Sequence, residues 1–380
     1  MSAMKKCIVI SDSFKGTLSS LEICGIARQS IPKFFPDCKV VDLPVADGGE
    51  GTVECFIQAL QAQPVTVEAA GPYGEPVQAI YCRSGKRAVI EMASTAGLPM
   101  VEGRLNPEKT TTYGVGQLIA HAVKYGCTEV LLGLGGSCTN DGGCGCAAAL
   151  GTRFFRENGE EFVPTGGDLS QIAHVSTAET KERLAGVKIT VMCDVDNPLH
   201  GPRGAAPVFG PQKGADGAMV ERLDAGLRHL DGVIRQDLGL EIGTLPGAGA
   251  AGGMGAGSVA FLGAELKPGI EAVLDMMDFD RHLKTADLVI TGEGRIDGQS
   301  VHGKVISGIA RRTRPKNVPL IAIVGGIGPG AEEAYELGVT AIFGTDRPAT
   351  DFRQYPEPAS VYYQHTLEDI LRLIQAVSRR

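Results

Sequence analysis

Carboxylates that precede glycine stand one residue beyond the ends of the first two apolar runs of this sequence. Asp12 follows the run 6–10, and Asp47 follows the run 40–45. A carboxylate in such a place can bind a cation or accept a proton, and glycine lets a ligand approach the backbone. Aspartate also caps helices well, and this second interpretation stays open for both residues. The neighbouring candidates are Ser13 and Lys15 after the first run and Gly48, Gly49 and Glu50 after the second.

A glycine-rich segment, 134–143, follows the apolar run 129–134. Its glycines permit positive φ and leave amides and hydroxyls free to hold an anion, so the segment is a candidate phosphate loop. It is not the dinucleotide-binding fingerprint, because G-x-G-x-x-G/A would need glycine or alanine at Cys138. A simple tight turn remains the alternative. The candidate ligand-binding residues are Gly135, Gly136, Ser137, Thr139, Asn140 and Asp141.

A second glycine run, 247–255, contains Gly252 and Gly253 and opens a predicted helix. The run could close over a phosphate, which makes these two residues candidates for ligand binding, or it could permit tight helix packing. Both alternatives need glycine, so the sequence does not choose between them.

Asp194 and Asp196 follow the apolar run 187–193 and are separated by one residue. On an extended segment the two side chains project to the same side. Mg²⁺ binds one or two carboxylates together with waters and phosphate oxygens, so the pair is a candidate metal or catalytic site. A solvated turn is the alternative.

The segment 292–305 follows the run 287–291 and combines glycine with charge. Its second half, 298–305, matches G-x-x-x-x-G-K-[ST] except at Val305, which lacks the hydroxyl that would hold magnesium. We therefore do not assign a Walker loop, although its lysine and glycines remain candidates for phosphate contact. The candidates in the whole segment are Glu293, Arg295, Asp297, Ser300 and Lys304.

Short apolar runs alternate with segments of helical spacing along the chain. This alternation predicts an α/β fold with mainly parallel sheets, in which ligands bind beyond the carboxyl ends of the strands. The predicted strands cover 6–11, 40–45, 88–92, 129–134, 187–193, 287–291, 320–324 and 341–343. The predicted helices cover 21–31, 52–60, 114–124, 220–238, 305–311 and 367–377.

Turn-rich stretches at 71–75 and before residue 287 divide the chain. The flanks hold two and three predicted strands in a simple strand–helix rhythm, which suits one parallel Rossmann-like or flavodoxin-like sheet. The middle has a predicted hairpin at 65–92, the densest glycine clusters and a long helix. We therefore predict a discontinuous domain, 1–70 plus 286–380, with a second α/β domain, 71–285, inserted into it.

The 380 residues have the composition of a globular protein, with 43% hydrophobic and 21% charged residues. The net charge of −8 disfavours nucleic acid, and no apolar run approaches the roughly 20 residues of a membrane helix. The ten cysteines are widely spread, which favours reduced thiols in a cytoplasmic protein over a disulfide framework. We expect small-molecule partners, no nucleic acid and no membrane, and a homo-oligomer stays open.

Six motifs, in order along nearly the whole chain, resemble those of the bacterial glycerate kinases of the first type. They are DSFKGTLS at 12–19, ADGGEGT at 46–52, LGGSCTNDGG at 134–143, CDVDNPL at 193–199, FGPQKGA at 209–215 and TGEGRIDGQS at 291–300. The resemblance implies ATP-dependent phosphorylation of D-glycerate, usually to 2-phosphoglycerate, with Mg²⁺. It also implies two α/β domains with the active site in the cleft between them. Two small departures are Cys138, where alanine is familiar, and Ser300, where threonine is common.

Phosphoryl transfer requires a metal, cations at the phosphates and a carboxylate near the attacking hydroxyl. The candidates for countering phosphate charge are Lys15, Arg295 and Lys304. The candidates for holding Mg²⁺ or its waters are Glu293, Asp297 and Asp194. Asp47 is the candidate for orienting or deprotonating the hydroxyl, with Asp194 as its rival.

Two other functions compete with this one. A dinucleotide-dependent oxidoreductase is compatible with the fold, but the missing G-x-G-x-x-G opposes it. A non-catalytic small-molecule sensor would not be expected to gather carboxylates beside glycine loops.

Overall fold

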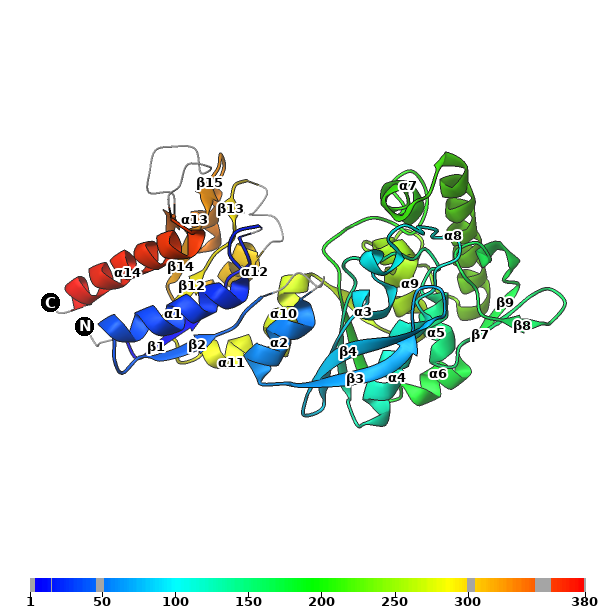
Figure 1. The fold of residues 1–380 in the computed structure, drawn as a ribbon, viewed down its shortest axis with the longest axis horizontal. Coiled ribbons are helices and arrows are strands. Elements are labelled where there is room, and N and C mark those ends of the chain that lie inside the picture. Colours follow the sequence, from blue (N-terminus) through cyan, green and yellow to red (C-terminus); the bar gives the residue numbers. More distant parts are fainter. Residues whose placement is uncertain (1–3, 15, 46–50, 299–304, 346–356, 379–380) are drawn as a thin grey trace. The chain divides into compact units, whose positions relative to one another are not determined.

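The computed structural model describes residues 4–14, 16–45, 51–298, 305–345 and 357–378. The chain forms two compact units: unit 1 contains Met1–Ala46 and Val273–Arg380, and unit 2 contains Asp47–Ala272. In each unit, helices accompany a central sheet (Figure 1). The α/β fold class predicted from the sequence is confirmed.

Unit 1 is built on a five-stranded sheet in which all neighbouring strands are parallel. The strands are β1 (Lys6–Val9), β2 (Lys39–Asp42), β12 (Leu288–Thr291), β14 (Leu320–Val324) and β16 (Ala341–Gly344). Their spatial order is β16-β14-β12-β1-β2, which becomes the flavodoxin-like order 2-1-3-4-5 when these strands are counted along the chain. The winding therefore reverses between β1 and β12, the switch point at which such sheets bind ligands.

Helices α1 (Ser20–Phe34) and α14 (Ala359–Ser378) share one apolar core with β1 and β12. On α1, Ile23, Ala27 and Ile31 recur every four residues, which places them on one buried face. Ser19 forms a capping box with Glu22 and so fixes where this helix begins. Further helices of unit 1 are α11 (Phe279–Leu283), α12 (Val305–Thr313) and α13 (Glu333–Leu337), and α10 (Gly269–Met276) spans the boundary between the units in sequence.

Unit 2 is built on a six-stranded mixed sheet in the order β11-β10-β6-β5-β4-β3. The strands are β3 (Gln63–Ala70), β4 (Pro76–Ser84), β5 (Arg87–Glu91), β6 (Glu129–Gly133), β10 (Lys188–Met192) and β11 (Glu265–Lys267). The pairs β3–β4 and β4–β5 are antiparallel, in keeping with the predicted hairpin, and the pairs from β5 to β11 are parallel. The carboxyl ends of β5, β6, β10 and β11 therefore meet at one edge of the sheet.

The predicted division of the chain differs from the division into units. The stretch 71–75 joins β3 to β4, with the Gly71 amide donating to the Glu75 carbonyl at 2.6 Å, and β3 pairs with β4 along all eight of its residues. This pairing holds β3 in the unit 2 sheet, and the segment 47–70 accordingly falls in unit 2. The second boundary between the two units falls between Ala272 and Val273. The sequence predicted this boundary further along the chain, between residues 285 and 286.

Some helices of unit 2 pack closely because glycine has no side chain at the contact. A Cβ on Gly116, in α4 (Tyr113–Lys124), would overlap the carbonyl oxygen of Cys146 in α5 (Cys144–Ala149), so glycine is needed for this approach. Further helices are α2 (Thr52–Leu60), α3 (Ala93–Ala96), α6 (Ala178–Arg183), α7 (Ala205–Phe209), α8 (Gly217–Leu238) and α9 (Ala250–Leu262). A small sheet of β7 (Arg153–Phe155), β8 (Glu161–Phe162) and β9 (His174–Ser176) contacts α8.

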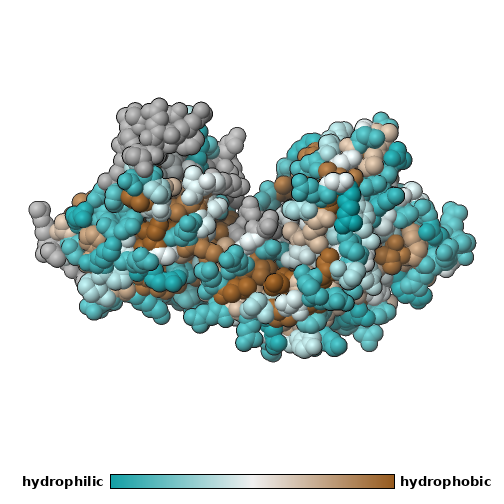
Figure 2. Space-filling view, viewed as in Figure 1, coloured by the Kyte–Doolittle hydropathy of each residue, from teal (hydrophilic) through white to brown (hydrophobic). Residues whose placement is uncertain are grey.

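The visible face of each unit is mixed: many hydrophilic residues surround several hydrophobic patches (Figure 2). No helix in the described ranges is long and apolar enough to cross a bilayer. All ten cysteines are free thiols, and all but Cys193 are buried.

Candidate active site

The segment 134–143, here called the glycine loop, follows β6 at the carboxyl edge of the unit 2 sheet. Gly136 and Gly142 have φ of +72° and +63°, a backbone conformation that favours glycine. The segment 96–98 exchanges main-chain hydrogen bonds of 2.7 and 2.9 Å with Gly136 and Cys138. The loop is therefore held firmly in a place where α/β sheets bind ligands.

Asp141, a predicted ligand-binding residue of the glycine loop, is fully buried and accepts hydrogen bonds from four protein donors. The amide and hydroxyl of Thr112 each donate at 2.8 Å, and the amides of Gly143 and Gly145 donate at 3.1 and 3.2 Å. Burial raises the pKa of Asp141, and these hydrogen bonds act in the opposite direction. The carboxylate joins the loop to the starts of α4 and α5, which is a structural role.

The second glycine run packs against the glycine loop. Gly252 has φ +68°, and a Cβ there would overlap the Thr139 carbonyl oxygen. Its own carbonyl accepts from the Gly142 amide at 3.0 Å, and a Cβ on Gly253 would lie 2.9 Å from the Gly142 Cα. The tight-packing alternative therefore accounts for both Gly252 and Gly253.

Thr139 and Asn140 carry buried polar groups that the protein does not satisfy. Asn140 is 1% exposed, and neither its carboxamide oxygen nor its nitrogen has a hydrogen-bond partner among the described residues; the same holds for the buried Thr139 hydroxyl. A buried polar group without a partner costs about 1–3 kcal/mol. The glycine loop therefore carries three buried polar atoms without a partner among the described residues.

Lys213 also belongs to this site, although its residue type and spacing did not predict it. It ends the 3₁₀ turn η3 (Pro211–Lys213), is 2% exposed, and donates from Nζ to Ser137 Oγ at 2.9 Å and to the Thr139 carbonyl at 2.7 Å. Burial lowers its pKa to about 8. The available signal was its place between two glycines in FGPQKGA, one of the motifs that carry the resemblance.

Asp194 and Asp196, predicted to project to one side, have different partners. Asp194 Oδ1 accepts from the Gly269 amide at 2.8 Å, at the first residue of α10. Asp196 is exposed and forms an ion pair with Arg203, with 3.1 Å from Nη2 to each carboxylate oxygen. Of the two, Asp194 is therefore the one held at the carboxyl edge of the sheet.

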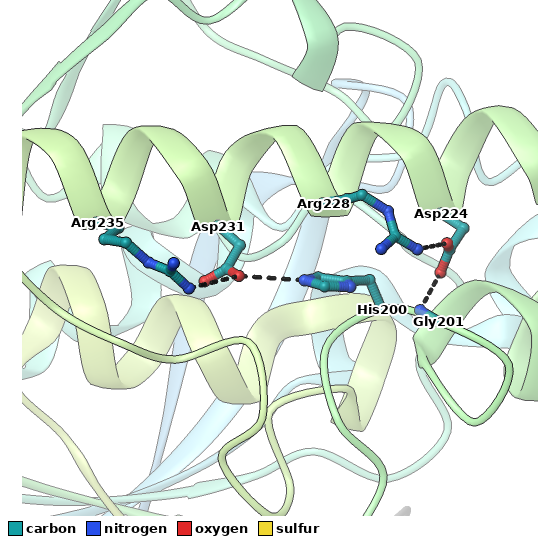
Figure 3. A network of polar contacts seen from close by, with 6 residues as sticks. All are labelled: His200, Gly201, Asp224, Arg228, Asp231 and Arg235. Atoms are coloured by element: carbon teal, nitrogen blue, oxygen red, sulfur yellow. Dashed lines mark hydrogen bonds and ion pairs between the residues drawn. The ribbon is translucent and has the colours of Figure 1, made fainter.

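The loop between β10 and α7 is tied to one face of α8 (Figure 3). His200 Nε2 lies 3.1 Å from Asp231 Oδ2, and the Gly201 amide donates to Asp224 Oδ1 at 2.7 Å. Arg228 pairs with Asp224 at 3.0 Å, and Arg235 lies 3.8 Å from Asp231. These contacts anchor the segment that follows Asp194 and keep its backbone in one place.

In unit 1 the candidates lie at the switch point. The Asp12 amide donates to the Gly292 carbonyl at 2.9 Å, which joins the segments after β1 and β12. Asp12 Oδ1 accepts from the Ser13 amide at 2.7 Å, whereas the N-cap of α1 is Ser19, so Asp12 does not cap that helix. Glu293 follows directly and is 5% exposed.

The following turn is stabilised by a short pair of strands. β13 (Arg295–Ile296) pairs in parallel with β15 (Gly326–Ile327), and Arg295 Nε lies 3.6 Å from Asp297 Oδ2. A cation and two carboxylates therefore share one short segment of unit 1.

The sequence model of the glycerate kinase family matches residues 7–375. The chain belongs to this family. It is 46% identical over 343 residues to a glycerate kinase of Halalkalibacterium halodurans, covering 90% of each chain. It is 44% identical over 341 residues to the glycerate 2-kinase of Escherichia coli K12, covering 89% of this chain and 90% of that one. A solved structure from Salmonella typhimurium LT2, described as a glycerate kinase 2, matches with a TM-score of 0.87 and 40% identity, over 99% of this chain and 100% of that one.

Membership of the glycerate kinase family makes this chain a kinase. Seven of its predicted site residues lie outside the described residues: Lys15, Asp47, Gly48, Gly49, Glu50, Ser300 and Lys304. Of the predicted metal ligands, Glu293 and Asp297 belong to unit 1 and Asp194 to unit 2. No group of three or more His, Cys, Asp or Glu side chains suited to a metal ion occurs within the described ranges. Mg²⁺ held mainly by phosphate oxygens and waters needs only one or two carboxylates, so this kinase's Glu293 and Asp297 fit it.

Proposed function

We propose that this member of the glycerate kinase family transfers the γ-phosphoryl group of ATP to D-glycerate with Mg²⁺, in the manner of the first type of bacterial glycerate kinase. The 2-hydroxyl is the proposed acceptor, because the E. coli relative is named a glycerate 2-kinase. The observation that carries the proposal is the family match over residues 7–375. The glycine loop supports it, because a buried lysine and unsatisfied polar groups suit an anionic substrate.

The proposed roles follow from charge and position. The glycine loop and the cations Lys15, Arg295 and Lys304 hold anionic groups of the two substrates. Asp47 orients or deprotonates the attacking hydroxyl, with Asp194 as the rival for this role. Most of the rate enhancement in such a reaction comes from positioning and from stabilising charge on the transferred group. The proposal therefore draws on residues of both units.

Mg²⁺, when bound with ATP, neutralises charge on the phosphate oxygens. Glu293 and Asp297 are the residues proposed to hold the ion or its waters, together with Asp194. The hard carboxylate oxygens of these residues are the ligands that Mg²⁺ prefers.

The test is to incubate the protein with ATP, Mg²⁺ and D-glycerate and to measure ADP release and the phosphorylated product by ³¹P NMR. We expect glycerate-dependent ADP formation with the phosphate on the 2-oxygen, and loss of turnover in excess chelator. The same mixture without D-glycerate is the control. Absence of glycerate-dependent turnover would reject the function, and a phosphate on the 3-oxygen would reject the assigned position.

A further inference from the structure

The Ser137 hydroxyl accepts a hydrogen bond but donates none to the residues that the structure describes. Its oxygen accepts from Lys213 Nζ at 2.9 Å, and this is its one hydrogen bond within the described part of the chain. A hydroxyl carries one donor hydrogen besides its acceptor lone pairs. Because the ammonium occupies a lone pair, the Ser137 hydrogen points away from Lys213, and no described residue accepts it. Ser137 itself is 8% exposed.

Lys213 is a buried cation that forms no ion pair with any residue the structure describes. Its two hydrogen-bond acceptors, Ser137 Oγ and the Thr139 carbonyl, are neutral, and no carboxylate lies within 4 Å of Nζ in the described ranges. Burying an ammonium group is costly unless a negative charge offsets it. An anionic ligand beside the glycine loop would supply that charge.

The neighbouring side chains carry further polar groups without partners. The Thr139 hydroxyl and the Asn140 carboxamide are buried, and none of their polar atoms has a hydrogen-bond partner in the described part of the chain. Ser137, Thr139 and Asn140 thus provide up to three side-chain donor groups over four residues of one loop. The loop follows a parallel strand at the edge where α/β sheets bind ligands.

On the basis of the proposed function, we infer that Lys213 and Ser137 form a relay that binds an oxyanion, either the carboxylate of the acceptor or a phosphate of the nucleotide. Ser137 donates its hydrogen to the anion. Lys213 is a positioning residue that orients this hydrogen and polarises the O–H bond through the oxygen. Hydrogen bonds with a charged partner are about twice as strong as neutral ones. The relay therefore makes a short serine side chain an effective anion ligand.

The charge on Lys213 makes the relay dependent on pH. Burial lowers its pKa to about 8, and Cys138 and Asp141, the titratable groups of the glycine loop that act on it, shift the pKa in the opposite direction. A bound anion favours the charged ammonium further. Above about pH 8 the free protein loses this charge, so an anion that uses the relay binds more weakly as the pH rises.

The experiment measures binding by isothermal titration calorimetry with three separate probes: ADP, D-glycerate and inorganic phosphate. The variants are Lys213→Met, Ser137→Ala and the double variant. The matched control is Lys188→Met, because Lys188 is an exposed lysine at the opposite end of β10 from Asp194. Circular dichroism checks that each variant is folded.

The relay predicts that both single substitutions weaken binding of the same probe by about 10- to 100-fold. The double variant should be no more than about twofold weaker than the worse single variant, because the two residues act as one unit. Binding by the wild type should weaken between about pH 7 and about pH 9, and Lys213→Met should lose this dependence. Weakened ADP and phosphate binding identifies the nucleotide as the source of the anion, and weakened D-glycerate binding identifies the acceptor.

Unchanged affinity for all three probes in the folded single variants would overturn the relay, and so would additive effects in the double variant. If Lys213→Met does not fold, two other measurements test the relay. Normal affinity of Ser137→Ala for all three probes would reject it, and so would wild-type binding that does not change with pH. These measurements do not require turnover. An absence of glycerate kinase activity, which would reject the proposed function, is therefore distinct from a failure of the relay.

Discussion

Thr112 and Asp141, which are 29 residues apart in the chain, are joined by two hydrogen bonds of 2.8 Å from the amide and the hydroxyl of Thr112 to one carboxylate oxygen. The same hydroxyl accepts from the Cys146 amide at 2.8 Å. All three residues are fully buried. This network fixes the end of the glycine loop against the first turns of two helices.

Asp141→Asn is therefore expected to lower the free energy of unfolding by about 2–4 kcal/mol. The asparagine amino group can only donate, and it would face amide donors that need an acceptor. Urea unfolding followed by circular dichroism measures the change. Asp196→Asn is the control, because its exposed ion pair with Arg203 should matter little. Equal stability of the two variants would contradict the role assigned to Asp141.

Gly252→Ala should damage the site as well as the fold. The new Cβ would overlap the Thr139 carbonyl, which is the group that Lys213 binds, and would displace the loop. Gly263→Ala is a close control: its φ of +65° resembles the +68° of Gly252, but a Cβ there meets nothing within 4 Å.

Strain of the left-handed backbone alone should cost about 1–2 kcal/mol in Gly263→Ala. Gly252→Ala should cost about 1–3 kcal/mol more and should also weaken ligand binding. Urea unfolding and calorimetric titration with ADP and D-glycerate check the two statements. Similar losses in both variants, with normal binding, would show that the close contact is unimportant.

Asp47→Asn should lower kcat by about 10²- to 10⁴-fold and leave ATP binding nearly unchanged, because the amide keeps the shape of the side chain and removes its charge. Steady-state kinetics with D-glycerate, together with titration of ATP, measures both effects. Asp194→Asn tests the rival assignment, although it also alters an acceptor for the Gly269 amide. A near-normal kcat in Asp47→Asn would reject Asp47 as the group that acts on the hydroxyl.

The thiols of Cys138, Cys144 and Cys146, near the glycine loop, are expected to take no part in catalysis. Burial raises the pKa of Cys138 to about 12 and also raises those of Cys144 and Cys146, so all three stay protonated and unreactive. The variant with alanine at all three positions should retain substantial turnover, with some loss of stability from the space left behind. A folded triple variant whose kcat falls by several orders of magnitude would contradict this.

The fold was predictable to the extent that local pattern determines it. Buried parallel strands such as β12 and β14 are short apolar runs, and the helices between them keep a helical spacing of apolar residues. Local pattern does not place the division near residue 70, because that division depends on long-range packing: β3 pairs with β4 along its whole length and falls in unit 2 with it.

The site was predictable only in outline. The sequence places the glycine loop after a strand, but it does not show that Asp141 is enclosed by four donors or that Lys213 is buried. Both facts depend on segments far apart in the chain, since Lys213 lies 76 residues from Ser137. The sequence also leaves open both uses of Gly252, and the contact with Thr139 supports the packing one.

The place of β1 in the unit 1 sheet has a consequence for how the enzyme is made. β1 lies between β2, which follows it closely, and β12, and the Lys5 amide donates to the Asp287 carboxylate across 282 residues. On the ribosome, β1 can pair with β2 but must wait for its other neighbour, β12, which is synthesised after every strand of the unit 2 sheet. Pairing across so long a separation slows folding. The nascent chain thus carries an unpaired sheet edge through most of its synthesis, and it can become an active kinase only when translation is nearly finished.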